Sequence, residues 1–162
     1  MVVMMGNKKI VICDIDGTIA DTSLRVKERD EYIKESGSKR NSWKVFNRGI
    51  GKEPVKEDVK AVVVALHKMG YQIVYLSGRE DAFKAKTERW LAMNDFPDGM
   101  LFMRKARDFR KDNIVKKELF EEMCLQVGHN DVLLCIDDRD QVVELWRKEL
   151  NLTCLQVDYG NF

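Results

Sequence analysis

Apolar residues in this chain fall into short runs, separated by longer segments in which apolar and charged residues are mixed. The runs are rich in Val, Ile, Leu and Cys, and their length is typical of strands buried on both faces of a parallel sheet. They predict five strands, at residues 10–13, 71–76, 99–103, 132–136 and 153–157. The intervening segments predict helices at residues 54–69, 80–93, 112–127 and 138–150. This alternation predicts an α/β fold, a Rossmann-like parallel sheet of about five strands with helices on both faces.

One segment, residues 21–54, interrupts the alternation, and we call it the insert. It follows the first strand directly, and its pattern predicts a charged helix over 24–35 and a short helix capped by Ser42. We expect the insert to form a small cap over the carboxyl end of that strand. Its aromatic residues Trp43 and Phe46 are interpreted as packing against the body of the protein rather than as a stacking surface for nucleobases.

Length and composition are typical of one globular domain. The chain has 162 residues, of which 44% are hydrophobic and 34% charged, so it can bury a core and is neither disordered nor fibrous. We therefore expect a single domain over residues 1–162, with residues 21–54 as its cap insert. No apolar run approaches the roughly 20 residues of a membrane span, and the first strand turns acidic too soon for a signal peptide. A cytoplasmic protein with no membrane contact is expected.

Cysteines and histidines argue against two other classes of site. The four cysteines form no C-x-x-C pair, and we interpret them as small buried apolar residues in a reducing compartment. Neither His67 nor His129 has a neighbouring metal ligand, so a zinc site is not expected. A serine hydrolase is not expected either, because the chain has no G-x-S-x-G motif.

The net charge of +1 conceals two basic segments. Residues 24–60 hold eleven Lys/Arg against seven Asp/Glu, and residues 104–117 hold seven against two. Charged segments are often only solvated surface, but two of them beside an acidic site would suit a polyanionic substrate.

Two carboxylates follow the first strand. Asp14 and Asp16 are separated by one residue, so both side chains point off the carboxyl end of the sheet where the chain stays extended. Gly17 then allows a sharp turn, and Thr18 adds a hydroxyl. Two close carboxylates indicate a bound metal, a shared proton or both, whereas a D-x-D motif alone is more often an acidic turn.

Polar residues also follow two other predicted strands. Ser77, Gly78 and Arg79 follow the second, and Asp137 and Asp138 follow the fourth. A lysine, Lys116, lies near the start of the helix that precedes the fourth strand. Because parallel strands end at one edge of the sheet, these groups should meet there. Together they suit phosphoryl transfer through an aspartyl-phosphate: a carboxylate nucleophile, Mg²⁺, and donors for the phosphoryl oxygens.

The four motifs, D-x-D-G-T, S-G-R, a lysine and D-D in this order, resemble the haloacid dehalogenase superfamily of phosphatases. Longer stretches resemble the 3'-phosphatase domain of bacteriophage polynucleotide kinase/phosphatase: GYQIVYLSGRE, RKDNIVKKELF and IDDRDQVVELWRKELNLTCLQVDYGNF. The resemblance covers nearly all of residues 9–162 and is weakest in the insert.

The resemblance implies roles for the residues of the D-x-D and S-G-R motifs. Asp14 would take the phosphoryl group, and Asp16 would protonate the leaving alkoxide and then activate water, which requires a pKa nearer neutrality than that of a free aspartate. Ser77 and Arg79 would contact the phosphoryl group, and Thr18 and Gly78 would lie beside the substrate.

Further roles fall on the second half of the chain. Lys116 would bind a phosphoryl oxygen, and Asp112 would orient Lys116 or Arg79. Mg²⁺ would be held by Asp14, Asp137 and the backbone carbonyl of Asp16, with Asp138 in or just outside the metal's coordination shell. Asp138 is equally well explained as the N-cap of the helix that follows.

The resemblance favours a Mg²⁺-dependent phosphomonoesterase that acts on nucleic-acid 3'-phosphate ends in end repair, from a virus or prophage. A free nucleoside monophosphate is an alternative substrate, and a non-catalytic domain that keeps only the fold is a third interpretation. Kinase activity is not expected, since Gly49–Lys52 lacks the spacing and the Ser/Thr of a phosphate loop. A separate kinase or ligase would be a natural partner, and the oligomeric state is left open.

Overall fold

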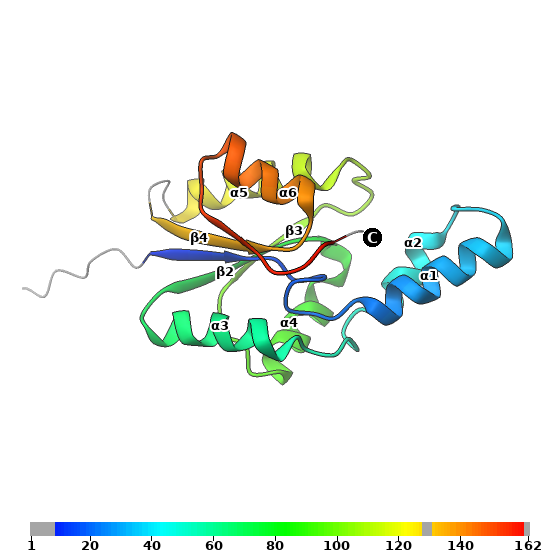
Figure 1. Cartoon of the computed structure of the whole chain (residues 1–162), viewed down its shortest axis with the longest axis horizontal. Coiled ribbons are helices and arrows are strands. Elements are labelled where there is room, and N and C mark those ends of the chain that lie inside the picture. The colour runs from blue at the N-terminus through cyan, green and yellow to red at the C-terminus, as the bar shows by residue number, and fades with distance from the viewer. Residues whose placement is uncertain (1–8, 128–130, 161–162) are drawn as a thin grey trace, which may run out of the picture.

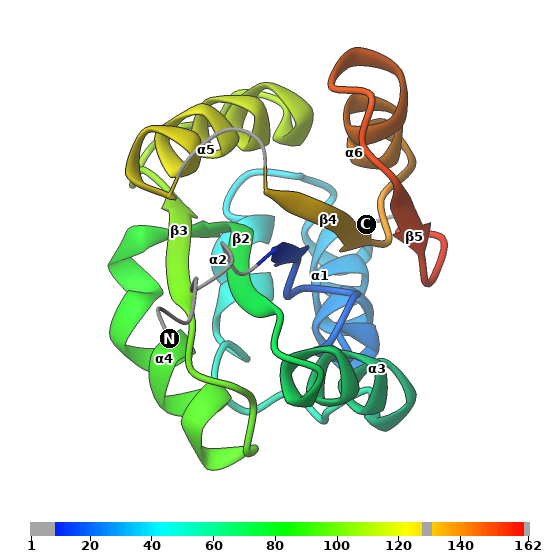
Figure 2. The same cartoon turned by 90° about the vertical axis from the view of Figure 1, so that its left-hand side faces the viewer.

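The structure, a computed structural model, describes residues 9–127 and 131–160. Its centre is a five-stranded parallel sheet in the order β3-β2-β1-β4-β5, which is seen end-on in Figure 2. The strands are β1 (Ile10–Cys13), β2 (Gln72–Glu80), β3 (Met100–Arg104), β4 (Val132–Asp137) and β5 (Cys154–Gln156). The predicted fold class is confirmed, and the strand that precedes the D-x-D motif is the central one.

Helices cover both faces of the sheet, as Figure 1 shows. On one face lie α3 (Glu57–Lys68) and α4 (Lys84–Met93), and on the other lie α5 (Asp112–Val127) and α6 (Asp140–Glu144). A π-helical turn, η2 (Leu145–Glu149), continues α6. Side chains of β1 alternate between two cores: Ile12 packs in the core that holds Trp146, and Val11 packs in the one that holds Val63 and Trp90. This alternation explains why β1 is apolar at every position.

The insert lies beyond the carboxyl end of the sheet. It contains α1 (Ser23–Ser36) and α2 (Ser42–Asn47), which pack against each other and extend from the body of the molecule (Figure 1). Gly37 ends α1 in the left-handed conformation. Ser42 is not the cap of α2, as the sequence suggested, because Asn41 occupies that position with a positive φ.

Several predicted boundaries shift in the structure. Residues 80–93 are not one helix: β2 runs to Glu80, where it pairs with Arg104 of β3, and a short 3₁₀ turn, η1 (Asp81–Phe83), precedes α4. The helix predicted over 138–150 begins only at Asp140, and its N-cap is Arg139. Asp138 is therefore not the N-cap. Its carboxylate is left for other contacts.

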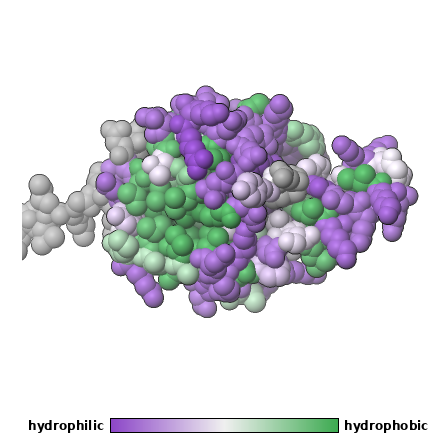
Figure 3. All heavy atoms as spheres, in the orientation of Figure 1, coloured by the Kyte–Doolittle hydropathy of each residue, from purple (hydrophilic) through white to green (hydrophobic). Residues whose placement is uncertain are grey.

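Some apolar residues of the helices are exposed. In α3 the buried residues are Val59 and Val63, whereas Val62 and Met69 face solvent, because a helix contacts a sheet along one stripe only. Met93 at the end of α4 is also exposed. On the face in Figure 3, hydrophobic side chains gather over the strands above α3, and the insert is mostly hydrophilic.

The predicted state of the cysteines is confirmed. All four are buried, and none is in a disulfide. Among the described residues, no helix has the length and apolar character that a membrane span requires.

Candidate active site

The acidic turn after β1 is anchored by its threonine. The Thr18 hydroxyl donates a hydrogen bond to Asp14 Oδ2 (3.0 Å) and lies 3.3 Å from Asp138 Oδ1. Gly17 has φ 82°, a conformation that residues with a side chain rarely adopt. The turn thus places Asp14, Thr18 and Asp138 together, although Asp138 lies 120 positions away from Thr18.

A buried lysine joins the two acidic motifs. Lys116 Nζ of α5 lies 2.8 Å from Asp14 Oδ1 and 2.8 Å from Asp137 Oδ2, and we call these three residues the Lys116 cluster. The indole of Trp146 also donates to Asp137, over 3.2 Å. Burial by itself would lower the pKa of Lys116, but Asp137 and Asp14 raise it well above its usual value. The lysine is therefore held as a cation.

The carboxylates at this edge fit a divalent cation. Oxygen atoms of Asp14, Asp137 and Asp138 lie within 4.8 Å of one another. Burial raises the pKa of Asp14 well above its usual value, against the effect of Lys116, and burial together with Asp137 raises the pKa of Asp138 to about 6. The Lys116 ammonium group thus faces three carboxylates, so negative charge exceeds positive charge at this edge. Carboxylate oxygens are also the ligands that Mg²⁺ prefers.

Asp16 has a different environment from Asp14. Its Oδ1 accepts from Arg25 Nη1 (2.7 Å) and from Arg79 Nε (2.9 Å). Glu53 Oε1 contacts the same two guanidinium groups, at 2.8 Å from Arg25 Nη1 and 2.6 Å from Arg79 Nη2. We call these four residues the Asp16 cluster, and its charges balance.

The pKa expected for Asp16 is wrong for this arrangement. Burial would raise the pKa, but Arg79 and Arg25 outweigh it and lower the pKa to about 2. The side chain also turns away from the three clustered carboxylates, so only the backbone carbonyl of Asp16 is left for the metal role suggested by the resemblance. The expectation assigned Arg79 to the phosphoryl group rather than to Asp16, and it did not include Arg25.

Arg25 and Glu53 were not found from the sequence. Both belong to the insert, and Arg25 is the one buried residue of α1, a helix that otherwise looks like a solvated charged segment. Arg25 Nε also donates to the Phe46 carbonyl oxygen (2.8 Å), and its stem packs so close to Gly49 that a Cβ there would lie 2.6 Å from Arg25 Cγ. In the sequence, the only signals are a glycine at position 49 and an acid at position 53. These are too weak to identify the partners of Asp16.

The S-G-R motif and Asp112 meet at the end of β2. Ser77 is fully buried, and its hydroxyl oxygen accepts the backbone N–H of Arg79 (3.2 Å). Gly78 leaves room for Asp112, because a Cβ at this position would collide with the Asp112 carboxylate. Asp112 lies 3.9 Å from Lys116 Nζ, one of the two neighbours suggested for it, but its closer partner is Arg104 (2.9 Å).

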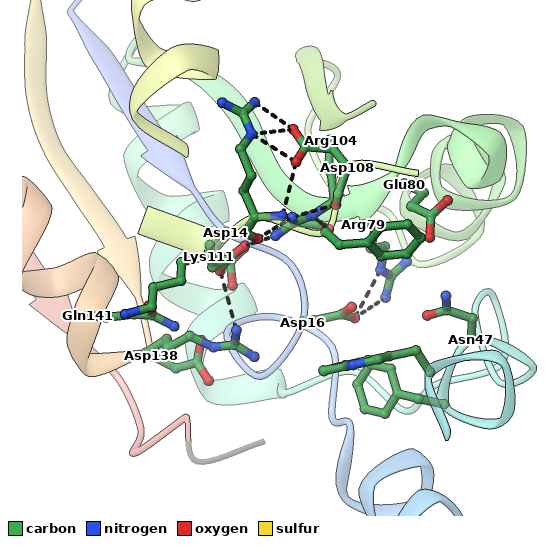
Figure 4. A pocket seen from close by; sticks show the side chains of 17 residues that line it. Asp14, Asp16, Asn47, Arg79, Glu80, Arg104, Asp108, Lys111, Asp138 and Gln141 are labelled. Carbon is green, nitrogen blue, oxygen red and sulfur yellow. Dashed lines mark hydrogen bonds and ion pairs between the residues drawn. The ribbon is translucent and has the colours of Figure 1, made fainter. Parts of the chain in front are cut away.

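A cavity of about 320 Å³ opens over these groups. It lies between the insert, the loop that joins β3 to α5, and the ends of the strands. In Figure 4, Asp16 and Arg79 face each other, with Asn47 of α2 on one side and Asp138 and Gln141 on the other. The 17 lining residues are Asp14, Asp16, Trp43, Phe46, Asn47, Gly78, Arg79, Glu80, Arg104, Asp108, Phe109, Arg110, Lys111, Asp112, Asp138, Arg139 and Gln141.

The two aromatic residues of α2 differ from each other. Phe46 is buried, at 3% exposure, and packs under the guanidinium of Arg25, another residue of the insert. Trp43 does not pack against the body: it is 51% exposed and lines the cavity. The interpretation of Trp43 as a packing residue is therefore wrong, because α2 turns that side of the helix to the cavity.

Part of the basic segment 104–117 is paired with acids. Arg104 pairs with Asp112, and Arg110 pairs with both Asp108 and Glu118. Asp108 and Asp112 are already included in the count of seven Lys/Arg against two Asp/Glu, so the segment keeps its excess of positive charge.

Comparison with known proteins agrees with this geometry. A haloacid dehalogenase-like hydrolase from Streptococcus pneumoniae superposes with a TM-score of 0.69 at 15% identity, over 96% of this chain and 87% of that one, which shows the fold. The fold and the acidic site agree with a phosphatase of the haloacid dehalogenase superfamily, and a family model shows the membership. The family model described as the polynucleotide kinase PNKP phosphatase domain matches residues 8–162, and the chain belongs to this family.

Two relatives are longer proteins. In the structure of a Pnkp1/Rnl/Hen1 complex, one chain superposes with a TM-score of 0.76 at 38% identity, over 98% of this chain and 48% of that one. A protein of Autographa californica nuclear polyhedrosis virus, named "Putative bifunctional polynucleotide kinase/RNA ligase", is 29% identical over 149 residues, 90% of this chain and 19% of its own length. This chain therefore spans less than half of the first relative and about a fifth of the second.

Proposed function

We propose that this domain is a Mg²⁺-dependent phosphomonoesterase that removes the 3'-phosphate from nucleic-acid ends through an aspartyl-phosphate on Asp14. The observation that carries the proposal is the placement of Asp14, buried at the end of β1 and 2.8 Å from Lys116, in a chain of the PNKP phosphatase family. A lysine at this distance can bind a phosphoryl oxygen beside the carboxylate that attacks the phosphorus.

In the first step an Asp14 oxygen attacks the phosphorus, and the bond between phosphorus and the 3'-oxygen breaks. Lys116 and Ser77 are buried at the same edge, where they would hold phosphoryl oxygens, and Arg79 lines the cavity beside them. Thr18 keeps the Asp14 carboxylate oriented through its 3.0 Å hydrogen bond. Asp112, 3.9 Å from Lys116, would help to position that lysine.

Asp16 would move the protons. It would give one to the leaving 3'-oxygen, then take one from the water that attacks the aspartyl-phosphate, which releases inorganic phosphate and restores Asp14. With Arg79 and Arg25 both bound to it, Asp16 of the free domain is an anion. It would therefore have to take up a proton from solvent when the substrate binds, before it gives that proton to the leaving 3'-oxygen. A phosphoryl group that draws Arg79 toward itself would weaken this stabilisation and raise the pKa of Asp16.

Asp14, Asp137 and Asp138 would hold the metal, since their oxygens lie within 4.8 Å of one another. When bound, Mg²⁺ supplies the positive charge that offsets repulsion between the Asp14 carboxylate and an anionic phosphate. The backbone carbonyl of Asp16 would complete this set. The carboxylate excess at this edge supports the assignment.

The substrate class rests on the relatives. One similar chain belongs to an RNA repair complex, Pnkp1/Rnl/Hen1, and the viral relative is named for a polynucleotide kinase and an RNA ligase. We infer that this domain acts on polynucleotide ends beside kinase and ligase activities. Four free buried cysteines agree with a reducing, cytoplasmic setting.

Phosphate release with Mg²⁺ present tests the proposal. The substrates are a 3'-phosphorylated oligonucleotide, the same strand phosphorylated at its 5' end, and nucleoside 3'- and 5'-monophosphates, each as DNA and RNA versions. We expect the 3'-phosphorylated strand to give the highest kcat/KM, and the Asp14→Asn protein to be inactive. A preference for the free monophosphates would make the domain a nucleotidase with the same mechanism. No release from any substrate by a folded, Mg²⁺-saturated protein would support a non-catalytic domain.

A further inference from the structure

Two aromatic side chains on opposite segments line the cavity and are largely exposed. Trp43, from α2 of the insert, is 51% exposed, and Phe109, from the loop between β3 and α5, is 87% exposed. Large aromatic side chains are costly to leave in water, and at the mouth of a charged site they are frequent binding surfaces. The other large aromatic residue of α2, Phe46, is buried.

Trp43 is held in a defined position relative to the acid–base residue. Its ring lies edge-on to Phe46, with 5.3 Å between the ring centroids, and the Arg29 guanidinium lies 5.3 Å from the Trp43 ring centroid. Phe46 in turn lies under Arg25, which binds Asp16. The indole is therefore connected to Asp16 through two packed side chains, and it is ordered without being buried.

Charge accounts for only part of what the cavity offers to a substrate. Arg104 and Arg110 of its β3–α5 wall are paired with carboxylates, whereas Lys111 of the same wall lines the cavity and has no ion pair among the described residues. Aromatic stacking is the further interaction that this wall and the insert offer to a part of the substrate next to the phosphate. Every nucleobase has a π face, and stacking on an aromatic side chain tolerates any base.

We propose that Trp43 is the stacking surface for the nucleobase of the 3'-terminal nucleotide, an inference that rests on the proposed function. The insert would then select nucleotide ends over other phosphate esters by means of the base, without reading its identity. Phe109 lines the same cavity from the body and provides a comparison residue of the same chemistry.

The first test compares two substrates that differ only in the base. One is a 3'-phosphorylated oligonucleotide, and the other is the same strand with an abasic 3'-terminal residue that carries the phosphate. We expect the wild-type kcat/KM to be about tenfold higher for the strand with the base. This ratio should fall close to one in Trp43→Ala, and Trp43→Phe should retain most of it. Leu24→Ala, an exposed apolar position of α1 that does not line the cavity, should keep the wild-type ratio.

The outcomes are separable from those of the proposed function. If the wild type fails to prefer 3'-phosphorylated strands, the proposed function fails. If the wild type prefers them and the ratio is the same in Trp43→Ala, the assignment of Trp43 is overturned while the function stands. A ratio that is lost in Phe109→Ala but kept in Trp43→Ala also overturns it.

A binding measurement gives an independent readout. The chain has three tryptophans, and Trp90 and Trp146 are buried, so ligand-induced quenching of fluorescence should come from Trp43. The 3'-phosphorylated strand should quench the fluorescence of the Asp14→Asn protein, and the quenching should be absent when Trp43→Phe is added. Equal quenching in both proteins, or none at a strand concentration that saturates binding by anisotropy, would contradict the proposal.

Discussion

The two aspartates of the D-x-D motif lie two positions apart and belong to two unlike charge clusters. The Lys116 cluster is built from the body alone, from the end of β1, α5 and the end of β4. The Asp16 cluster joins body and insert, because Arg25 and Glu53 come from the insert. Burial raises the pKa of Asp14, whereas Arg79 and Arg25 outweigh burial and lower the pKa of Asp16 to about 2.

The difference lies in how the charges balance. The Lys116 cluster, with Asp138 beside it, has one cation against three carboxylates, and it therefore suits a further cation. The Asp16 cluster has two cations against two carboxylates and needs none. The two aspartates thus acquire different chemistry. Asp14 lies at the proposed metal site, and Asp16 lies in a cluster that takes one of its cations and one of its carboxylates from the insert.

The largest expected effect comes from replacing the proposed nucleophile, Asp14. Asp14→Asn should lower phosphate release roughly 10⁴-fold or more, because the amide cannot form the aspartyl-phosphate. The side chain keeps its shape, so the thermal unfolding midpoint should change little. Asp30→Asn, an exposed position of α1, serves as the control and should keep full activity. Substantial activity in Asp14→Asn would remove Asp14 as the nucleophile.

The Lys116 cluster can be tested by removing its one cation, Lys116. Lys116→Met should reduce the free energy of unfolding by about 3–5 kcal/mol, because it leaves Asp14 and Asp137 buried without their partner. Mg²⁺ should recover part of this loss, and should raise the unfolding midpoint of the variant more than that of the wild type. The matched control is Lys117→Met, since Lys117 pairs with Glu149 at the surface. If both variants respond alike to urea and to Mg²⁺, the carboxylates around Lys116 do not bind the metal.

The Asp16 cluster should make the free energy of unfolding depend on pH in the acid range. A pKa of about 2 in the folded protein, below the unfolded value, means that the stabilisation is complete above pH 5 and is lost as the pH falls toward 2. It amounts to roughly 2–3 kcal/mol. In urea unfolding between pH 5 and pH 2.5, the wild type should lose more stability than Asp16→Asn. Parallel losses in the two proteins would show that Asp16 is not held by the arginines.

The smallest effect should come from the insert side of the Asp16 cluster. Glu53→Gln removes the acid shared by Arg25 and Arg79 but leaves Asp16 with both arginines, so we expect kcat to fall about tenfold, or 1.4 kcal/mol, through misplacement of Asp16. KM for a small phosphate ester should change less than kcat. Glu57→Gln, on the exposed start of α3, is the control. A change in KM alone would mean that Glu53 acts on substrate binding and does not position Asp16.

Much of the fold and the body side of the site could be predicted because the signals are local. Each strand is marked by a short apolar run, and parallel strands bring their carboxyl ends to one edge. The polar residues at the ends of β1, β2 and β4 therefore meet there. The helix predicted at residues 112–127 is confirmed as α5, and it carries Lys116 to Asp14. Asp138 was open between two interpretations, and the start of α6 at Asp140 removed one of them.

By itself, the sequence determined the sheet, the set of polar groups at its edge and the family, because these depend on local patterns and motif order. Only the tertiary structure decided the partners of Asp16, the exposure of Trp43 and the pairing of the basic segment. Arg25 and Glu53 are 28 positions apart, and nothing near either residue marks it as buried. The burial of a charge, and the pKa that follows from it, is set by groups that the fold brings together from distant parts of the chain.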